Sequence, residues 1–289
     1  MPLTRSRLLA VALVFGSMVV YEISAAWAVR LFDRVGPLGM VAYRNIFGAL
    51  VLLLVVRPHW RTMTRQAWLW TAALGLSLAV MNPLFYQSLS RIGLGAAATL
   101  EGLGPLVLAV ALGRRWRSWL WALFAFGGLL ALERGGLERL DLLGVVLALA
   151  AGAAWAGYIV AAGRVGQIMP GISGLTVAMT MAAIAVMPMG LLSAGTAWFN
   201  PLTMLMGAGV AVAASSIPYG MEMVALKRLP TEAFSIMMSL TPAIAALSGL
   251  LFLNQRLTIP QWVGVAAVII ASAGAIMTTQ STPTESIAP

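Results

Sequence analysis

Four ionisable side chains stand inside apolar stretches of this sequence, where a role beyond packing is expected of them. They are Glu22, Arg44, Glu101 and Glu222. A charged side chain in hydrocarbon costs roughly 2.5–3.5 kcal/mol on insertion scales, so such residues usually pair, face water or mark the path of a substrate or proton. A carboxylate can hold an ammonium group or carry a proton, and an arginine can bind a carboxylate through two parallel hydrogen bonds. These residue types therefore indicate ligand binding and proton transfer within a membrane.

The sequence lacks the residues that other chemistries need. It contains no cysteine and a single histidine, His59, in a basic loop. Disulfides, thiolate metal sites, a histidine-based metal centre and a serine–histidine–acid set are therefore excluded. There is also no Walker loop to bind ATP. We expect the protein to have no enzyme activity, no metal and no cofactor.

The composition identifies lipid as the solvent of this chain. Of its 289 residues, 61% are hydrophobic and 9% are charged, whereas a soluble domain carries about 25% charged residues. So few charges cannot shield so apolar a chain from water. The net charge of +9 does not indicate nucleic acid, because the basic residues form short clusters between apolar runs, as residues that orient membrane helices do.

The apolar runs predict an all-α membrane protein with ten transmembrane helices. A helix needs about 20 residues to cross about 30 Å of hydrocarbon. The runs of suitable length cover residues 8–29, 38–56, 67–89, 94–112, 118–132, 142–163, 174–192, 202–226, 230–252 and 259–278. The first run has the basic start of a cleaved signal peptide, but its apolar stretch is long for that role.

The distribution of basic residues predicts that both termini lie in the cytoplasm. With ten spans and a cytoplasmic N-terminus, eleven basic residues fall on the inner side and six on the outer side. Basic residues accumulate in the cytoplasmic loops of membrane proteins. The excess therefore favours this orientation of the chain.

Two internal similarities predict that the chain is a duplicated unit of five helices. Residues 89–106 match residues 226–243 at a shift of 137, and residues 8–30 match residues 142–164 at a shift of 134. Because five spans are an odd number, the second unit enters the membrane from the opposite side. We therefore expect a 5+5 inverted repeat, with units at 1–140 and 141–289, as in many secondary transporters.

Helical geometry places three of the four ionisable residues at one depth. At about 1.5 Å per residue, Glu22, Arg44 and Glu101 all fall slightly to the outer side of the membrane centre. Charges at that depth should face each other or a water-filled cavity. The simplest arrangement pairs Glu22 with Arg44, either as a structural ion pair or as part of a site in which Arg44 holds a substrate carboxylate.

Glu222 is expected nearer the cytoplasmic end of its span. One interpretation is a partly hydrated carboxylate paired with Arg228, and the other is a relay for protons or substrate at an inner gate. Asn82, Tyr86 and Tyr219 add polar groups to the third and eighth spans. Trp155 is either a cavity residue or one of the aromatic residues that pack on a helix face or lie at the membrane interface.

Prolines within the spans predict interrupted helices. Pro83 and Pro218 fall in the third and eighth spans, and Pro105 and Pro242 fall in the fourth and ninth. A proline removes a backbone hydrogen bond and can kink its helix. Matching interruptions in two halves of a transporter indicate a binding site between them.

The stretches MNPLFYQSLSRIGLGAAATLEGLGPLVLAVAL (81–112) and IPYGMEMVALKRLPTEAFSIMMSLTPAIAALSGLLFL (217–253) resemble the two EamA-type repeats of the drug/metabolite transporter superfamily. The likeness extends over roughly residues 8–278 and is strongest toward bacterial exporters of threonine and homoserine, most specifically in PYGMEMVALKRLPTEAF. The resemblance implies a ten-helix carrier of the bacterial inner membrane that exports small neutral amino acids in exchange for protons. The residues whose types match those exporters are Arg44, Asn82, Tyr86, Glu101, Tyr219 and Glu222.

Two positions depart from the pattern of the wider superfamily. Thr241-Pro242 stands where Glu-Pro is common, and Asn254-Gln255 stands where Gly-Glu is favoured. If either family carboxylate carries protons, another must do so here, and Glu22, Glu101 and Glu222 are the candidates. The cargo is left open by these departures, because one scaffold of this kind serves many substrates.

The sequence thus predicts an exporter that works by alternating access and acts as a monomer or weak homodimer. In this hypothesis Arg44 binds the substrate carboxylate, Glu101 or Glu22 contacts the amino group or the coupling proton, and Glu222 serves the inner gate. Replacing Arg44 by Ala should then abolish transport and leave folding intact. The alternatives are an efflux carrier for hydrophobic drugs or other metabolites, which would depend on Trp155 and adaptable methionines, and a membrane scaffold or sensor that transports nothing.

Overall fold

The first part of the chain forms four long helices in a computed structural model. The structure describes residues 5–58, 60–92, 94–113, 119–121, 123–124, 126–128, 141–238, 240–252, 258–260, 262–264, 266–267 and 270–271. The long helices are α1 (Arg5–Val29), α2 (Phe32–Val56), α3 (Arg65–Ile92) and α4 (Leu94–Gly113), and a short turn, η1 (Trp60–Thr62), precedes α3. Gly36, with φ of 70°, interrupts the start of α2 just before the predicted span at 38–56.

The second part of the chain, from residue 141, is more segmented. Its elements are α6 (Leu142–Ile168), α7 (Ser173–Ala194), η3 (Gly195–Phe199), α8 (Pro201–Ala211), η4 (Val212–Ser216), α9 (Ile217–Leu226), α10 (Thr231–Met238) and α11 (Thr241–Phe252). The element η4 is a single π-helical turn between α8 and α9, so these three elements together occupy the predicted eighth span.

The described residues form helices and turns without a strand, which agrees with the predicted all-α class. Six segments are long and apolar enough to cross a membrane, and they lie at Leu8–Val29, Phe32–Val56, Arg65–Ile92, Leu142–Ile168, Ser173–Phe199 and Pro201–Leu226. These match six of the ten predicted spans. The fourth and ninth predicted spans correspond to α4 and to α10 with α11. The fifth and tenth lie partly outside the described residues, so the number ten stays a prediction.

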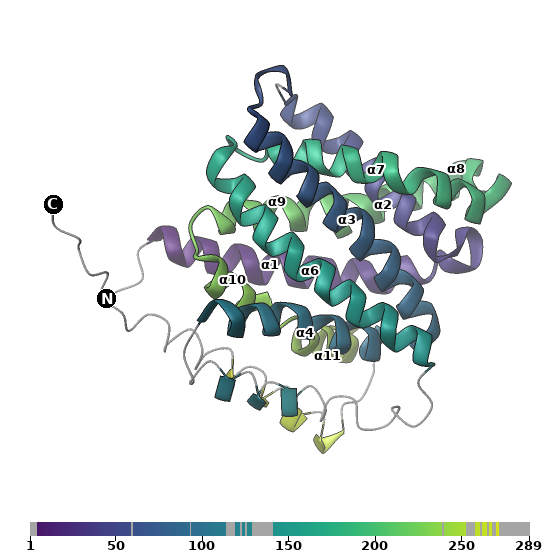
Figure 1. The fold of residues 1–289 in the computed structure, drawn as a ribbon. Helices are drawn as coiled ribbons and strands as arrows, with labels where there is room; N and C mark the ends of the chain where they lie inside the picture. Colours follow the sequence, from purple (N-terminus) through teal and green to yellow (C-terminus); the bar gives the residue numbers. More distant parts are fainter. Residues whose placement is uncertain are drawn as a thin grey trace, which may run out of the picture.

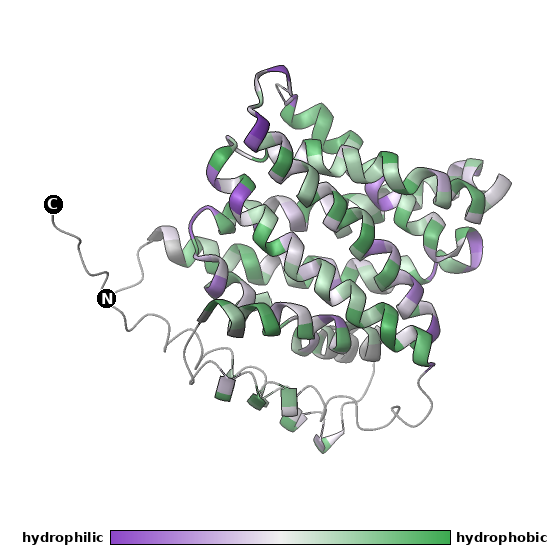
Figure 2. Cartoon of the chain, in the orientation of Figure 1, coloured by the Kyte–Doolittle hydropathy of each residue, from purple (hydrophilic) through white to green (hydrophobic). Residues whose placement is uncertain are grey.

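Large apolar side chains cover the outside of the bundle. Leu54, Leu192 and Leu205 are examples that are more than two-thirds exposed, at 74%, 86% and 72%. Figure 2 shows the hydrophobic colouring along most of the helices and the hydrophilic colouring mainly near their ends. A surface this apolar requires hydrocarbon around it. The chain is therefore a multi-pass membrane protein.

Helices from the two parts of the chain pack against each other throughout the bundle. Helix α3 lies along α6, α2 lies along α7, and α1 lies along α9 (Figure 1). Helix α4 packs on α6 from the other side, and α10 and α11 contact both α4 and α1. The interior between these helices therefore draws side chains from both parts.

Two glycines allow α4 and α6 to approach closely. A Cβ on Gly152 of α6 would lie 2.6 Å from the carbonyl oxygen of Glu101 in α4, and a Cβ on Gly104 would collide with the carbonyl of Gly152. Small residues at a helix crossing permit such backbone contact in membrane proteins. The crossing fixes the part of α4 that carries Glu101.

The predicted interruptions at prolines appear in the second part of the chain only. Pro218 stands at the start of α9, directly after η4, and Pro242 stands at the start of α11. By contrast, α3 and α4 continue as helices through Pro83 and Pro105. A membrane helix can tolerate an internal proline when its neighbours satisfy the freed backbone groups. The expectation of matched breaks was therefore wrong for the first part.

An exposed ion pair joins the end of α3 to the start of α6. The Arg91 guanidinium donates to the Asp141 carboxylate at 2.9 Å, and both side chains are more than 40% exposed. This hydrogen bond, together with one from the backbone N–H of Leu143, holds the pKa of Asp141 below its usual value. A buried bond from the Ser88 hydroxyl to the Gly144 carbonyl reinforces the junction.

Replacing Gly152 by Ala should destabilise the protein, because the new methyl group must push α4 away from α6. Overpacking of a tight interior typically costs about 1–3 kcal/mol. Thermal unfolding in detergent measures the effect. Gly209→Ala in α8 is the matched control, since a Cβ there meets no atom within 4 Å, and Ala favours a helix over Gly. Equal unfolding temperatures for the two variants would contradict the close crossing.

Candidate functional site

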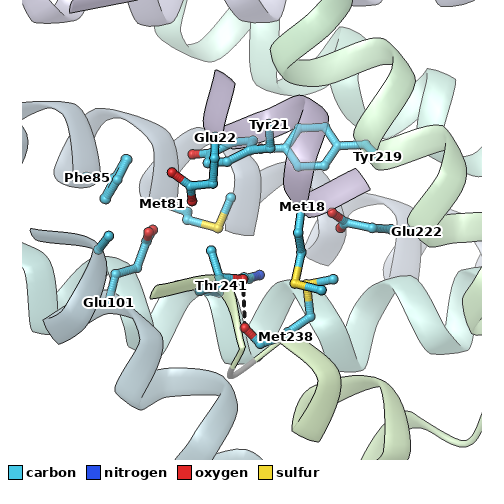
Figure 3. Close-up of a pocket in the computed structure, with 12 residues that line it drawn as sticks. Met18, Tyr21, Glu22, Met81, Phe85, Glu101, Tyr219, Glu222, Met238 and Thr241 are labelled. Carbon is cyan, nitrogen blue, oxygen red and sulfur yellow. Dashed lines mark hydrogen bonds between the residues drawn. The ribbon is translucent and has the colours of Figure 1, made fainter. Parts of the chain in front are cut away.

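An internal pocket lies between helices of both parts of the chain (Figure 3). It encloses about 470 Å³ of space between atoms, a figure that includes open space at its mouth. Its lining combines acids, aromatic rings and methionines. The lining residues are Met18, Tyr21, Glu22, Met81, Phe85, Ala98, Glu101, Trp155, Tyr219, Glu222, Met238 and Thr241.

Two buried carboxylates project into this pocket without a partner among the described residues. Glu22 comes from α1 and Glu101 from α4, and they are 3% and 6% exposed. Figure 3 shows both side chains directed into the same space. Among the described residues, neither carboxylate has a hydrogen bond or an ion pair. The prediction that these two acids face a common cavity is confirmed by the lining of the pocket.

Glu222 of α9 is the third acid of the pocket, and it has a partner. The Tyr158 hydroxyl of α6 donates to its Oε2 at 2.8 Å. Its side chain is 6% exposed. The expected pairing with Arg228 is not found in the described part of the chain, where Arg228 is exposed. Glu222 lies in the same pocket as Glu22 and Glu101, and its helix α9 packs against α1.

Arg44 of α2 is fully buried, with 0% exposure. Its Nη1 donates to the Tyr86 hydroxyl at 2.8 Å, and its Nε donates to Ser215 Oγ at 3.1 Å. Its Nη2 donates to the Ala214 carbonyl at 2.8 Å and makes a longer bond of 3.5 Å to the Tyr219 hydroxyl. Ala214 and Ser215 belong to η4, so the π-helical turn supplies half of the acceptors. The guanidinium therefore makes four hydrogen bonds to other groups of the protein.

Two tyrosines lie between Arg44 and the pocket. Tyr21 and Tyr219 line the pocket, and each also contacts Arg44, whose Cζ lies 5.2 Å from the Tyr21 ring centroid. Arg44 itself is not part of the lining. The simplest sequence interpretation, an ion pair of Glu22 with Arg44, is wrong, because hydroxyl and carbonyl oxygens satisfy the arginine instead.

Asn82 and Tyr86 share the layer behind the pocket with Arg44. The Tyr219 hydroxyl donates to Asn82 Oδ1 at 3.1 Å, and Tyr86 accepts from Arg44. Neither Asn82 nor Tyr86 lines the pocket. The buried Asn82 Nδ2 atom has no hydrogen-bond partner among the residues that the structure describes. Direct substrate contacts by Arg44, Asn82 and Tyr86 are therefore not available in this conformation, since other side chains cover them.

Trp155 does line the pocket, which favours the cavity interpretation of this residue over the interface one. Thr241 also lines it, at the position where the wider superfamily often has a glutamate, and its hydroxyl donates to the Met238 carbonyl at 2.7 Å. The predicted residues Asn254 and Gln255 lie outside the described residues, as does His59.

The sequence analysis missed several lining residues that a repeat signal would have found. The offset of 134 relates Tyr21 to Trp155, and both line the pocket. The offset of 137 relates Phe85 to Glu222 and Glu101 to Met238, and all four line it as well. The same offset of 137 separates the hydrogen-bonded residues Asn82 and Tyr219. Positions related by the two offsets, including some just before the matched stretch at 89–106, thus meet at one site.

A helical bundle with an apolar outer surface and acids around an internal pocket has the general arrangement of a membrane transporter. The EamA-like transporter family matches residues 142–277 of this chain. The threonine/homoserine exporter RhtA of Salmonella typhimurium (strain LT2) is 39% identical over 261 residues, which cover 90% of this chain and 88% of that protein. The chain belongs to the EamA-like transporter family.

Other similar proteins agree with this assignment. RhtA of Escherichia coli (strain K12) is 36% identical over 272 residues, covering 93% of this chain and 92% of that protein. The uncharacterized transporter YwfM of Bacillus subtilis (strain 168) is 24% identical and covers 81% of this chain. A crystal structure with 17% identity matches 94% of the chain with a TM-score of 0.75, which supports the fold alone. These named relatives are transporters, not enzymes.

The contacts of Arg44 change the expected effect of removing it. Arg44→Ala would strip the Ala214 carbonyl and the Tyr86 hydroxyl of their donor, and a buried polar group left without a partner costs about 1–3 kcal/mol. We therefore expect a lower unfolding temperature in detergent, instead of intact folding. Arg164→Ala, at an exposed arginine of α6, is the control that should change little. A wild-type unfolding temperature for Arg44→Ala would show that the network adds no stability.

Proposed function

We propose that this protein is a secondary active exporter of small neutral amino acids of the threonine or homoserine type, or of related metabolites. The observation that carries the proposal is the internal pocket walled by Glu22, Glu101 and Glu222, in a chain 36–39% identical to threonine/homoserine exporters over about nine-tenths of its length. The walls of this pocket come from both parts of the chain. The protein lies in the bacterial inner membrane with both termini in the cytoplasm.

The proposed architecture is a 5+5 inverted repeat with units at 1–140 and 141–289. Its support is the reciprocal packing of helices, since α3 lies along α6 and α1 lies along α9. A pseudo-two-fold axis requires such exchanged partners when α6 is the equivalent of α1 and α9 the equivalent of α3. The family match over 142–277 falls within the second unit. In this arrangement the pocket opens alternately to each side as the two units rock against each other.

Proton coupling is assigned to the acids of the pocket. Glu22 and Glu101 are buried and have no partner in the part of the chain that the structure describes. A carboxylate in such a position can exchange a proton for a cationic substrate group without breaking a structural contact. Glu222 differs because Tyr158 donates to it. We assign Glu101 and Glu22 to the ammonium group and the coupling proton, and Glu222 to the gate between α6 and α9.

The residues behind the pocket are assigned to positioning. Arg44 holds Tyr86 and Tyr219, and Tyr219 in turn holds Asn82. Tyr219 is the member of this layer that reaches the pocket. A change in substrate contact at Tyr219 would therefore alter the hydrogen bonds of Arg44 and, through them, the contacts of the π-helical turn η4. Such π-helical turns often lie at functional sites.

The topology of the repeat can be tested directly because the chain has no cysteine. We expect Arg61→Cys and Pro170→Cys to be protected from a membrane-impermeant thiol reagent in intact cells and to be labelled after lysis. Thr196→Cys should be labelled in intact cells. All three residues are exposed in connections between helices. Labelling of the first two from outside would contradict the proposed orientation.

A second candidate function is efflux of hydrophobic drugs. The observation in its favour is the group of Met18, Met81 and Met238 in the pocket, because methionine adapts to ligands of varied shape. Cells that carry the protein would then resist hydrophobic dyes or antibiotics, and labelled threonine would not exchange. Counterflow of labelled threonine and homoserine in proteoliposomes separates the two candidates.

The acid that carries the coupling proton should be revealed by removing its charge. In Glu101→Gln proteoliposomes we expect uptake driven by a pH gradient to be lost, because a glutamine cannot bind and release the proton. Counterflow without a gradient should persist at a reduced rate, since the pocket keeps its shape.

Glu22→Gln tests the alternative assignment, and Asp33→Asn, at an exposed acid near the start of α2, is the control. Gradient-driven transport that survives both pocket substitutions would overturn the proposed coupling.

A further inference from the structure

The charged residues that line the pocket are all acidic. Glu22, Glu101 and Glu222 line it, and the described lining residues include no lysine, arginine or histidine. Two of the three acids have no partner within the described part of the chain. A small amino acid carries both an ammonium and a carboxylate group. The pocket offers acceptors to the first group and no cation to the second.

Arg44, a cation that contacts the lining residues Tyr21 and Tyr219, already has partners and is covered. Arg44 is 0% exposed and donates to Tyr86, Ser215 and the Ala214 carbonyl. A substrate carboxylate could reach it only after Tyr21 or Tyr219 moved away and after existing hydrogen bonds were exchanged. A bond to Arg44 would therefore replace contacts that the protein already makes, and its net gain would be small.

Aromatic faces add to the preference for a positive group. Tyr21, Phe85, Trp155 and Tyr219 all contribute to the lining. The face of an aromatic ring attracts cations, and the attraction grows when water is excluded. The remaining surface is apolar and flexible, from Met18 and two further methionines, which suits a short side chain of variable shape.

We infer that this pocket recognises the ammonium group of its substrate and not the carboxylate, so that small amines without a carboxylate are also ligands. The class comprises amino alcohols and the esters and amides of small amino acids. This inference rests on the proposed function of the same pocket and names the chemical group that its ligands share. The inference is carried by Glu22 and Glu101, which are more than nine-tenths buried, point into the pocket and have no partner among the described residues (Figure 3).

Two analogues of threonine test the contributions of its ammonium group and its carboxylate separately. L-threoninol keeps the ammonium group and lacks the carboxylate, whereas N-acetyl-L-threonine keeps the carboxylate and lacks the cation. In counterflow with labelled threonine, we expect threoninol to compete about as well as unlabelled threonine and N-acetylthreonine to fail. Loss of one hydrogen bond to a charged group costs about 1.5–3 kcal/mol, so Glu101→Gln or Glu22→Gln should weaken threoninol by about tenfold or more.

Asp33→Asn is the matched control, because it removes an exposed acid outside the pocket; it should leave competition unchanged. Competition by N-acetylthreonine but not by threoninol would overturn the inference. Failure of both analogues while threonine exchanges would overturn it too, since both ends of the substrate would then be required.

Direct binding distinguishes failure of this inference from failure of the proposed function. If the wild-type protein shows no threonine counterflow, the proposed function fails. Calorimetry with threoninol on the purified protein then decides the inference alone. Binding that weakens in Glu101→Gln and Glu22→Gln supports an amine site, and no binding, or binding unchanged in both variants, overturns it.

Discussion

The structure depends on how the buried guanidinium of Arg44 is satisfied without bulk water. Arg44 donates to oxygens of the protein, from Tyr86, Ser215 and the Ala214 carbonyl. Among the described residues, no carboxylate forms a hydrogen bond or ion pair with Arg44. The acids of the bundle are therefore left for the pocket, where Glu22 and Glu101 have no partner in the described structure. A conventional buried ion pair would have neutralised the pocket and tied an acid to a structural role.

This division separates the interior into two layers. The inner layer is acidic and aromatic and encloses the pocket, and the layer behind it is built around a buried guanidinium. Tyr219 belongs to both, since it lines the pocket and bonds to Asn82 and Arg44. Such a residue transmits a change at the pocket to helix α2 and to η4 through contacts that already exist. The close crossing of α4 and α6 at Gly152 holds the backbone of Glu101 in place beside the pocket.

Composition and hydropathy were sufficient to predict the helical class and the six long spans, because length and apolarity alone decide which segments can cross a membrane. They also predicted that Glu22 and Glu101 share a cavity, since depth follows from helical rise. The partners of Arg44 could not be predicted this way. Its acceptors Ala214 and Ser215 lie about 170 residues away, and two of its contacts depend on a π-helical turn that leaves no simple sequence pattern. Tyr21 and Met238 were missed for a different reason, since only the alignment of the two similar stretches points to them.

The turn η4 has a consequence for the direction of every side chain that follows it. A π-bulge amounts to one extra residue in an α-helix, and one residue corresponds to about 100° of rotation around the helix axis. Tyr219 and Glu222 come directly after this turn, in α9. Without the added residue the same sequence would present a different face of α9 to the interior, and both side chains would rotate away from the pocket. The acidity of the site is thus set by helical phase as much as by amino-acid identity.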